Sequence, residues 1–127
     1  MAHRSRLAGF IIDCHNTPAD EAAAFWSAAL GYRAQPAYSE EGAEYADLAG
    51  APAGLNVEVQ RVEHASRVHL DIESDDIDAE ASRLEALGAR RIGFVKRWWV
   101  MEAPTGHRFC IVRMRDGQEG AEANHWD

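Results

Sequence analysis

The clearest alternation of apolar and polar positions in the chain lies at residues 67–72. A strand with this pattern turns His69 and Asp71 to one face and its apolar side chains to the other. Apolar residues then recur at helical spacing over residues 75–87, which predicts an amphipathic helix. The helix is therefore expected to pack on the apolar face of the strand, and His69 and Asp71 are expected to point away from it.

The first half of the chain repeats this pattern. A short apolar strand over residues 8–13 leads into an amphipathic helix over residues 19–30, and both helices end in Ala-Leu-Gly-x-Arg. Further strands are predicted in the two halves, at residues 32–37, 44–48, 55–62, 90–95, 98–102 and 107–114. Because the unit occurs twice, the sequence indicates two similar packed modules; a solenoid would need at least three copies.

The two modules have the order βαβββ and span residues 7–62 and 67–115. At 127 residues the chain is too short for two independent cores, so we expect a single α+β domain over residues 1–127. The helices are expected to pack on the sheet through four large apolar residues, Phe25, Trp26, Leu84 and Leu87. Residues 116–127 have no apolar period, which predicts a mobile tail.

The charge pattern limits the classes of partner. Thirteen basic residues against twenty-one acidic ones give a formal net charge of −8, and the basic residues are scattered. No binding to nucleic acid or to an anionic membrane is expected from this pattern. The apolar run at residues 7–12 is too short for a membrane span or a signal sequence, so a cytoplasmic protein is expected. Cys14 and Cys110 are then expected to be reduced thiols.

The repeat identifies equivalent positions on the face that points away from the helices. When the aspartates that end the two first strands are aligned, Ile11 corresponds to His69. Alignment of the last strands of the two modules sets Glu58 opposite Cys110. The adjacent pair Trp98 and Trp99 must point to opposite faces of a strand, so one tryptophan is expected to face a ligand or a partner chain. The candidate ligand-binding residues are Ile11, Glu58, His69, Asp71, Trp98, Trp99 and Cys110.

The paired modules resemble the glyoxalase/bleomycin-resistance/dioxygenase group, the vicinal oxygen chelate superfamily. The resemblance covers residues 7–115 and rests on three stretches, FWSAALGY, HLDIESDDIDAEASRLEALGA and PTGHRFCIV. It implies a curved eight-stranded mixed sheet that forms a cup, with the helices on its outer face. It also implies that metal-using members hold Fe, Mn, Ni or Zn in the cup, with His and Glu from the first and last strands of each module.

This sequence departs from the implied metal-binding pattern. His69 and Glu58 match it, but Ile11 stands where the first His is implied and Cys110 stands where the final Glu is implied. An isolated carboxylate and imidazole hold a divalent metal weakly, so no metal cofactor is expected. Glu58 and His69 are instead expected to pair with each other or with Gln60 and Asp71. The alternative is a divalent Zn, Ni, Mn or Fe ion on Glu58, His69 and Cys110, a set that favours zinc.

Three functions follow from these observations. The first is a metal-independent glyoxalase-like protein that sequesters an organic ligand in the cup, as resistance proteins of the superfamily do. The second is a metal-dependent lyase or isomerase of glyoxalase type in which Glu58 moves a proton. The third is an interaction module whose exposed edges serve only to form dimers. The missing metal ligands favour the first, and the resemblance also implies a homodimer.

Overall fold

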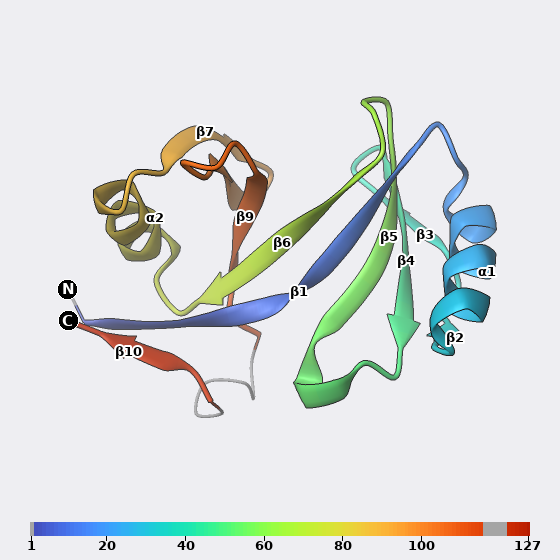
Figure 1. The fold of residues 1–127 in the computed structure, drawn as a ribbon, viewed down its shortest axis with the longest axis horizontal. Coiled ribbons are helices and arrows are strands. Elements are labelled where there is room, and N and C mark those ends of the chain that lie inside the picture. Colours follow the sequence, from blue (N-terminus) through green and yellow to red (C-terminus); the bar gives the residue numbers. More distant parts are fainter. Residues whose placement is uncertain (1, 116–121) are drawn as a thin grey trace. The chain divides into compact units, whose positions relative to one another are not determined.

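A computed structural model describes residues 2–115 and 122–127 of the chain (Figure 1). The chain divides into two compact units. Unit one comprises Met1–Ala8 and Leu70–Asp127, and unit two comprises Gly9–His69. Two long strands run through both units, β1 (His3–His15) and β6 (Arg67–Ser74). The bounds of the two units differ from those of the predicted modules, since β1 contributes its first residues to unit one and β6 contributes its first residues to unit two.

Unit two contains one α-helix and a sheet. Its elements after β1 are α1 (Ala19–Leu30), β2 (Arg33–Ala34), β3 (Tyr38–Glu40), β4 (Ala43–Ala49), a 3-10 turn (Pro52–Gly54) and β5 (Asn56–Val62). The strands lie in the order β2-β4-β5-β1, and β3 also pairs with β4. The β1 and β5 strands run parallel, while the other pairs are antiparallel.

Unit one repeats this arrangement. Its elements after β6 are α2 (Ile77–Ala86), β7 (Arg90–Val95), β8 (Trp98–Glu102), β9 (Arg108–Arg113) and β10 (Asn124–Trp126). The strands lie in the order β6-β9-β8-β7, with β6 and β9 parallel. The predicted α+β class and the repeated order of elements are confirmed. The described residues form ten strands, two more than predicted. The strand expected at 32–37 is reduced to β2, and β3 and β10 were not foreseen.

Each helix covers one face of its own unit's sheet. The α1 helix buries Ala19, Ala22 and Ala23 against apolar residues of β4 and β5, and these small side chains let the helix lie close to the strands. The α2 helix buries Ile77 and Ala81 against β8 and β9. We call the opposite face of each sheet the far face. Side chains alternate between the two faces along every strand, so burial under the helix identifies which residues lie on the far face.

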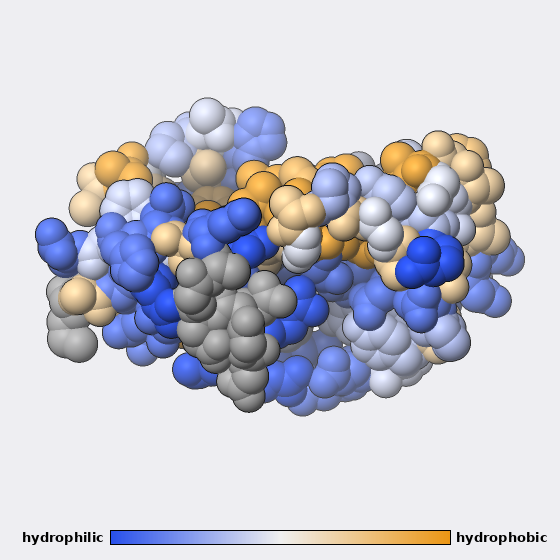
Figure 2. Space-filling view, turned by 90° about the horizontal axis from the view of Figure 1, so that it is seen from below, coloured by the Kyte–Doolittle hydropathy of each residue, from blue (hydrophilic) through white to orange (hydrophobic). Residues whose placement is uncertain are grey.

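Of the four residues predicted to pack the helices on the sheets, only two do so. Trp26 and Leu84 contact the two cores, but Phe25 and Leu87 are 64% and 66% exposed. The buried stripe of α1 follows positions 19, 22, 23 and 26, so Phe25 falls beside it despite its size. Figure 2 shows that hydrophobic residues reach the surface among the hydrophilic ones, in agreement with these exposed fractions.

The predicted packing of the second helix on residues 67–72 needs a similar correction. Ile72 contacts the α2 core, but Val68 and Leu70 are 57% and 42% exposed. The α2 helix packs instead on β9, β8 and β7.

The C-terminal residues differ from the expected mobile tail. Asn124–Trp126 forms β10, which pairs antiparallel with the start of β1, so that His3 lies opposite Trp126. The Trp126 ring lies 3.8 Å from the guanidinium carbon of Arg83, and its Nε1 donates to Ser5 Oγ at 2.9 Å. Residues 116–121 of the predicted tail lie outside the described residues. The final residues of the chain are therefore held by side-chain contacts that the missing apolar period did not reveal.

Candidate functional site

The alternation of side chains along β5 and β1 determines which residues lie on the far face of unit two. Val57 and Val59 are buried under α1, so Glu58 lies on the opposite face of the same strand. In the parallel register of β1 and β5, Ile11 lies opposite Glu58 and is 4% exposed. Asn56 Nδ2 donates to Glu58 Oε1 at 2.7 Å. Glu58 therefore has an amide and an alkyl group beside it, where the family resemblance implied an imidazole.

A buried carboxylate and a histidine form a second feature of this face. Asp13 Oδ2 and His69 Nδ1 lie 2.8 Å apart, and the Asp13 side chain is 2% exposed. Arg67 Nε lies 3.8 Å from the same oxygen of Asp13. The other oxygen, Asp13 Oδ1, is buried and accepts no hydrogen bond. One oxygen of Asp13 is therefore committed to His69, which fixes the orientation of the imidazole ring.

Asp13 was not among the site residues predicted from the sequence. It was used there only as the residue that ends the first strand. Its position two residues after Ile11 places both side chains on the same face, so strand alternation could have suggested it. Its contact with His69 depends on the fold, because 56 residues separate the two.

Two tyrosines add an aromatic part to the far face of unit two. Tyr38 and Tyr45 are register partners on β3 and β4, and their rings stack with centroids 5.5 Å apart. Asp47 lies on the same face of β4, opposite Glu58. Burial, followed by the charges of Glu58 and Asp47, raises the pKa of Tyr38 to about 12. The Tyr38 hydroxyl is therefore a proton-bearing group at neutral pH, and the sequence analysis did not identify it.

The far face of unit one carries Asp71 and Cys110. Phe109 and Ile111 of β9 are buried in the α2 core, so Cys110 lies on the opposite face of that strand. Cys110 is the register partner of Asp71 on one side and of Val100 on the other. The Asp71 carboxylate and the Cys110 thiol therefore lie on neighbouring strands, and the strand on the other side of Cys110 contributes the apolar Val100.

A set of potential metal ligands follows from the same strands. His69 and Asp71 lie two residues apart on β6 and so share a face. Together with Cys110 they form a group that could hold a metal ion, and no other such group is found in residues 2–115 and 122–127. Its nitrogen, oxygen and sulfur donors suit zinc better than manganese or iron. The carboxylate in this group is Asp71, whereas the sequence suggested Glu58.

The two adjacent tryptophans point in opposite directions, as expected. Trp99 contacts the α2 core, its Nε1 donates to Asp78 Oδ1 at 2.8 Å, and the guanidinium carbon of Arg91 lies 4.6 Å from its ring centre. Trp98 therefore lies on the far face of unit one, where it is half-buried. Of the two predicted aromatic contacts, Trp98 is the one that the far face can offer to a ligand.

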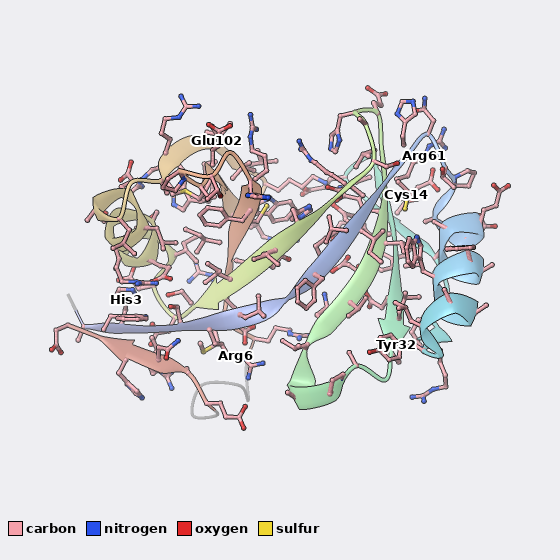
Figure 3. All side chains as sticks on the ribbon, viewed as in Figure 1. His3, Arg6, Cys14, Tyr32, Arg61 and Glu102 are labelled. Carbon is pink, nitrogen blue, oxygen red and sulfur yellow. The ribbon has the colours of Figure 1, made fainter. Side chains whose placement is uncertain are left out.

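The two cysteines have different surroundings. Both are free thiols, in agreement with the sequence analysis. Cys14 is part of the α1 core and lies on the helix side of unit two (Figure 3). Burial, with a further contribution from the charge of Asp13, raises the pKa of the Cys14 thiol. Cys14 is therefore a structural residue, and Cys110 is the cysteine on a far face.

Comparison with protein families identifies the chain. A family model for the glyoxalase-like domain matches residues 9–112. The chain belongs to the glyoxalase-like domain family. This confirms the resemblance on which the sequence analysis relied. No curated protein matches the sequence.

Solved structures show the same fold at low sequence identity. A hypothetical protein from Bacillus halodurans C-125 aligns with a TM-score of 0.66 and 12% identity, over 88% of this chain and 96% of that one. A methylmalonyl-CoA epimerase in complex with methylmalonyl-CoA and NH4+ aligns with a TM-score of 0.63 and 19% identity, over 89% and 96%. The epimerase from Mycobacterium tuberculosis aligns with a TM-score of 0.64 and 16% identity, over 91% of both chains. Within the described part of this glyoxalase-like chain, neither helix has the length and apolar character that a membrane span requires.

Proposed function

We propose that this glyoxalase-like protein binds a small organic molecule on the far face of unit two, with Glu58 and His69 as its polar anchors and without a stoichiometric metal ion. One observation carries the proposal. Ile11 lies opposite Glu58 in the strand register, in the position where the family resemblance implies a histidine ligand. An isoleucine side chain has no lone pair, so this arm of the chelate is missing and the neighbouring surface is apolar.

The chemistry of the face supports an aromatic or amphipathic ligand. Tyr38 is 42% exposed and stacks on the buried Tyr45, so it supplies aromatic surface, while Ile11 beside Glu58 is apolar and 4% exposed. Sites for small molecules typically combine such surfaces with a few directed polar groups. Here the directed groups are the carboxylate of Glu58, held by Asn56, and the imidazole of His69, held by Asp13.

A thermal-shift screen against a library of aromatic acids, amines and neutral fragments tests the proposal. Compounds that stabilise the unaltered protein are expected to lose their effect in Glu58→Ala and in His69→Ala. Glu21→Ala, a change at an exposed position of α1, serves as the matched control and is expected to keep the shifts. Shifts that persist unchanged in both far-face variants would contradict the proposed site.

A second function is favoured by the group of His69, Asp71 and Cys110. If these residues hold zinc, the ion would supply a Lewis acid that polarises a substrate carbonyl, as in a lyase or isomerase. Glu58 would then be the residue that moves a proton. The fold relationship to methylmalonyl-CoA epimerase makes such chemistry a reasonable alternative. Metal content and a metal-dependent activity would move the assignment from ligand binding to catalysis.

A homodimer remains a prediction, as does the cytoplasmic location. The strand β7 ends the strand order of unit one, and its Ile92, Phe94 and Val95 are 40%, 53% and 43% exposed. An edge strand with exposed apolar side chains favours association with a second chain. Sedimentation equilibrium at micromolar concentration is expected to give about twice the chain mass, and a species of 14.1 kDa would exclude the dimer.

A further inference from the structure

The pairing of Asp13 with His69 determines what the histidine can offer to a ligand. We propose that Asp13 is a positioning residue that holds His69 with its proton on Nδ1 and so presents Nε2 as a hydrogen-bond acceptor. The inference rests on the proposed function, because it takes His69 as an anchor of the ligand site. It deepens that function by predicting that the ligand group which meets His69 is a hydrogen-bond donor.

The direction of the hydrogen bond follows from the chemistry of the two groups. An ionised carboxylate can only accept, so the hydrogen between Asp13 Oδ2 and His69 Nδ1 belongs to the ring nitrogen. Arg67 Nε lies 3.8 Å from the same oxygen, so a guanidinium also faces this carboxylate. A neutral imidazole with its proton on Nδ1 has its lone pair on Nε2.

Both partners are placed by well-connected segments of unit two. Asp13 lies on β1 opposite Gln60 of β5, and its neighbours Ile12 and Cys14 belong to the α1 core. At the end of β1, the His15 backbone N–H donates to Ser66 Oγ at 2.9 Å. This bond ties β1 to the segment that leads into β6 and therefore to His69. Residues held by packed strands keep a side chain oriented more precisely than residues of loops.

A purely structural role for Asp13 fits the observations less well. Its Oδ1 is buried without a hydrogen bond, and an unsatisfied buried acceptor costs about 1–3 kcal/mol. A carboxylate retained for stability would be expected to have both oxygens satisfied. The side chain is instead placed so that one oxygen serves His69 and the other gains nothing from the protein.

Long-range 1H–15N correlation spectra of the uniformly 15N-labelled protein test the inference without any ligand. Where the spectra themselves report a neutral imidazole, we expect a protonated-type shift for Nδ1 of His69 and an unprotonated-type shift for Nε2. The signals of the His69 ring nitrogens are assigned as those that are missing from the spectrum of His69→Gln. In Asp13→Asn, the amide can turn its NH2 toward Nδ1, and the proton is expected to move to Nε2 in a large fraction of the molecules.

Two further variants complete the experiment. Asp47→Asn removes a carboxylate from the same far face without touching His69, and its spectrum is expected to keep the original proton position. Asp13→Glu keeps the charge and is expected to restore the Nδ1-protonated form in part. If Asp13→Asn fails to fold, the unaltered protein still decides, since a proton found on Nε2 there would overturn the inference. An unchanged spectrum in folded Asp13→Asn would also overturn it.

The outcome is separate from that of the ligand screen. If the spectra show the Nδ1 proton and its dependence on Asp13, but no compound depends on His69, the positioning role stands and the proposed function fails. If compounds depend on His69 but the proton lies on Nε2, the proposed function stands and the positioning role fails.

Discussion

Each unit of the protein contains a buried pair of a carboxylate and a histidine, and the two pairs differ in how completely they are satisfied. In unit one, His3 Nε2 lies 2.7 Å from Glu80 Oε1, and Figure 3 shows His3 close to α2. Arg83 donates to both oxygens of Glu80, at 2.8 Å each. In unit two, Asp13 has one bond to His69 and an oxygen that accepts nothing.

The difference separates a structural pair from a functional one. Glu80 is fully buried, and its carboxylate forms an ion pair with Arg83 and contacts His3 Nε2. Such a network fixes one arrangement of β1 and α2 and leaves no group for a ligand. The Asp13 pair lies on the far face and retains unused hydrogen-bonding capacity. We therefore expect changes at Glu80 to act on stability and changes at Asp13 to act mainly on the state of His69.

Removal of the Glu80 side chain is the largest expected effect. Glu80→Ala leaves Arg83 without its buried counter-charge and removes the oxygen that contacts His3 Nε2, and breaking a buried ion pair costs about 3–5 kcal/mol. The free energy of unfolding from urea denaturation measures the loss. Glu85→Ala, which removes only the surface ion pair with Arg91, is the control and should change it by about 1 kcal/mol or less. A loss at position 80 no larger than at position 85 would mean that the network does not stabilise unit one.

Acid should weaken the same network. Burial alone would raise the pKa of Glu80, but hydrogen bonds from Arg83, His3 and Ser5 outweigh it and hold the pKa below the ordinary 4.5. A carboxyl whose pKa is lowered by folding stabilises the protein fully above its unfolded pKa, and that contribution disappears as the pH falls through the folded value. The urea concentration at the midpoint of unfolding should therefore fall as the pH drops below about 4.5. It should fall more steeply in the unaltered protein than in Glu80→Gln. Parallel curves for the two proteins would contradict the assignment.

Asp13→Asn should cost less stability than Glu80→Ala. The isosteric amide can still bond to His69, and it loses only the charge-assisted part of one hydrogen bond, about 1–2 kcal/mol. The change in free energy of unfolding is measured in the same way. A loss as large as that of Glu80→Ala would remove the contrast between the two pairs and make Asp13 a structural residue.

The smallest expected effect concerns the strand β10. Trp126→Ala removes the stacking on Arg83 and the bond to Ser5, which together should contribute about 1–2 kcal/mol at this partly buried position. Trp126→Phe keeps the ring and should recover part of the loss. Unchanged stability in Trp126→Ala would show that the C-terminal residues do not support the Glu80 network.

Local sequence patterns were sufficient to predict most of the helices and strands. Both helices and most strands were predicted within a few residues, because their apolar periods and the glycines after the helices are local signals. Phe25 was assigned to the core because it lies at helical spacing from other apolar residues of α1, whereas the residues actually buried are Ala19, Ala22 and Ala23. Strand alternation placed Ile11 and Glu58 on the face away from the helices, but their position opposite each other comes from the parallel register of β1 and β5.

The two buried pairs could not be predicted in the same way. His3 and Glu80 are 77 residues apart, and Asp13 and His69 are 56 residues apart. A hydrophobic period treats Glu80 as a surface residue, since it carries no information about a distant partner that neutralises the charge. Strand alternation gives the face on which Asp13 lies, but the hydrogen bond depends on how the end of β1 meets the start of β6.

Elemental analysis of protein purified without a histidine tag tests the central claim most directly. We expect no stoichiometric transition metal in the unaltered protein, because Ile11 has no donor atom at the position where a histidine ligand is implied. Metal should appear in the double variant Ile11→His, Cys110→Glu, which restores the implied ligand types. About one equivalent of tightly bound metal in the unaltered protein, lost in His69→Ala, would contradict the claim and favour a metal-dependent enzyme built on His69, Asp71 and Cys110.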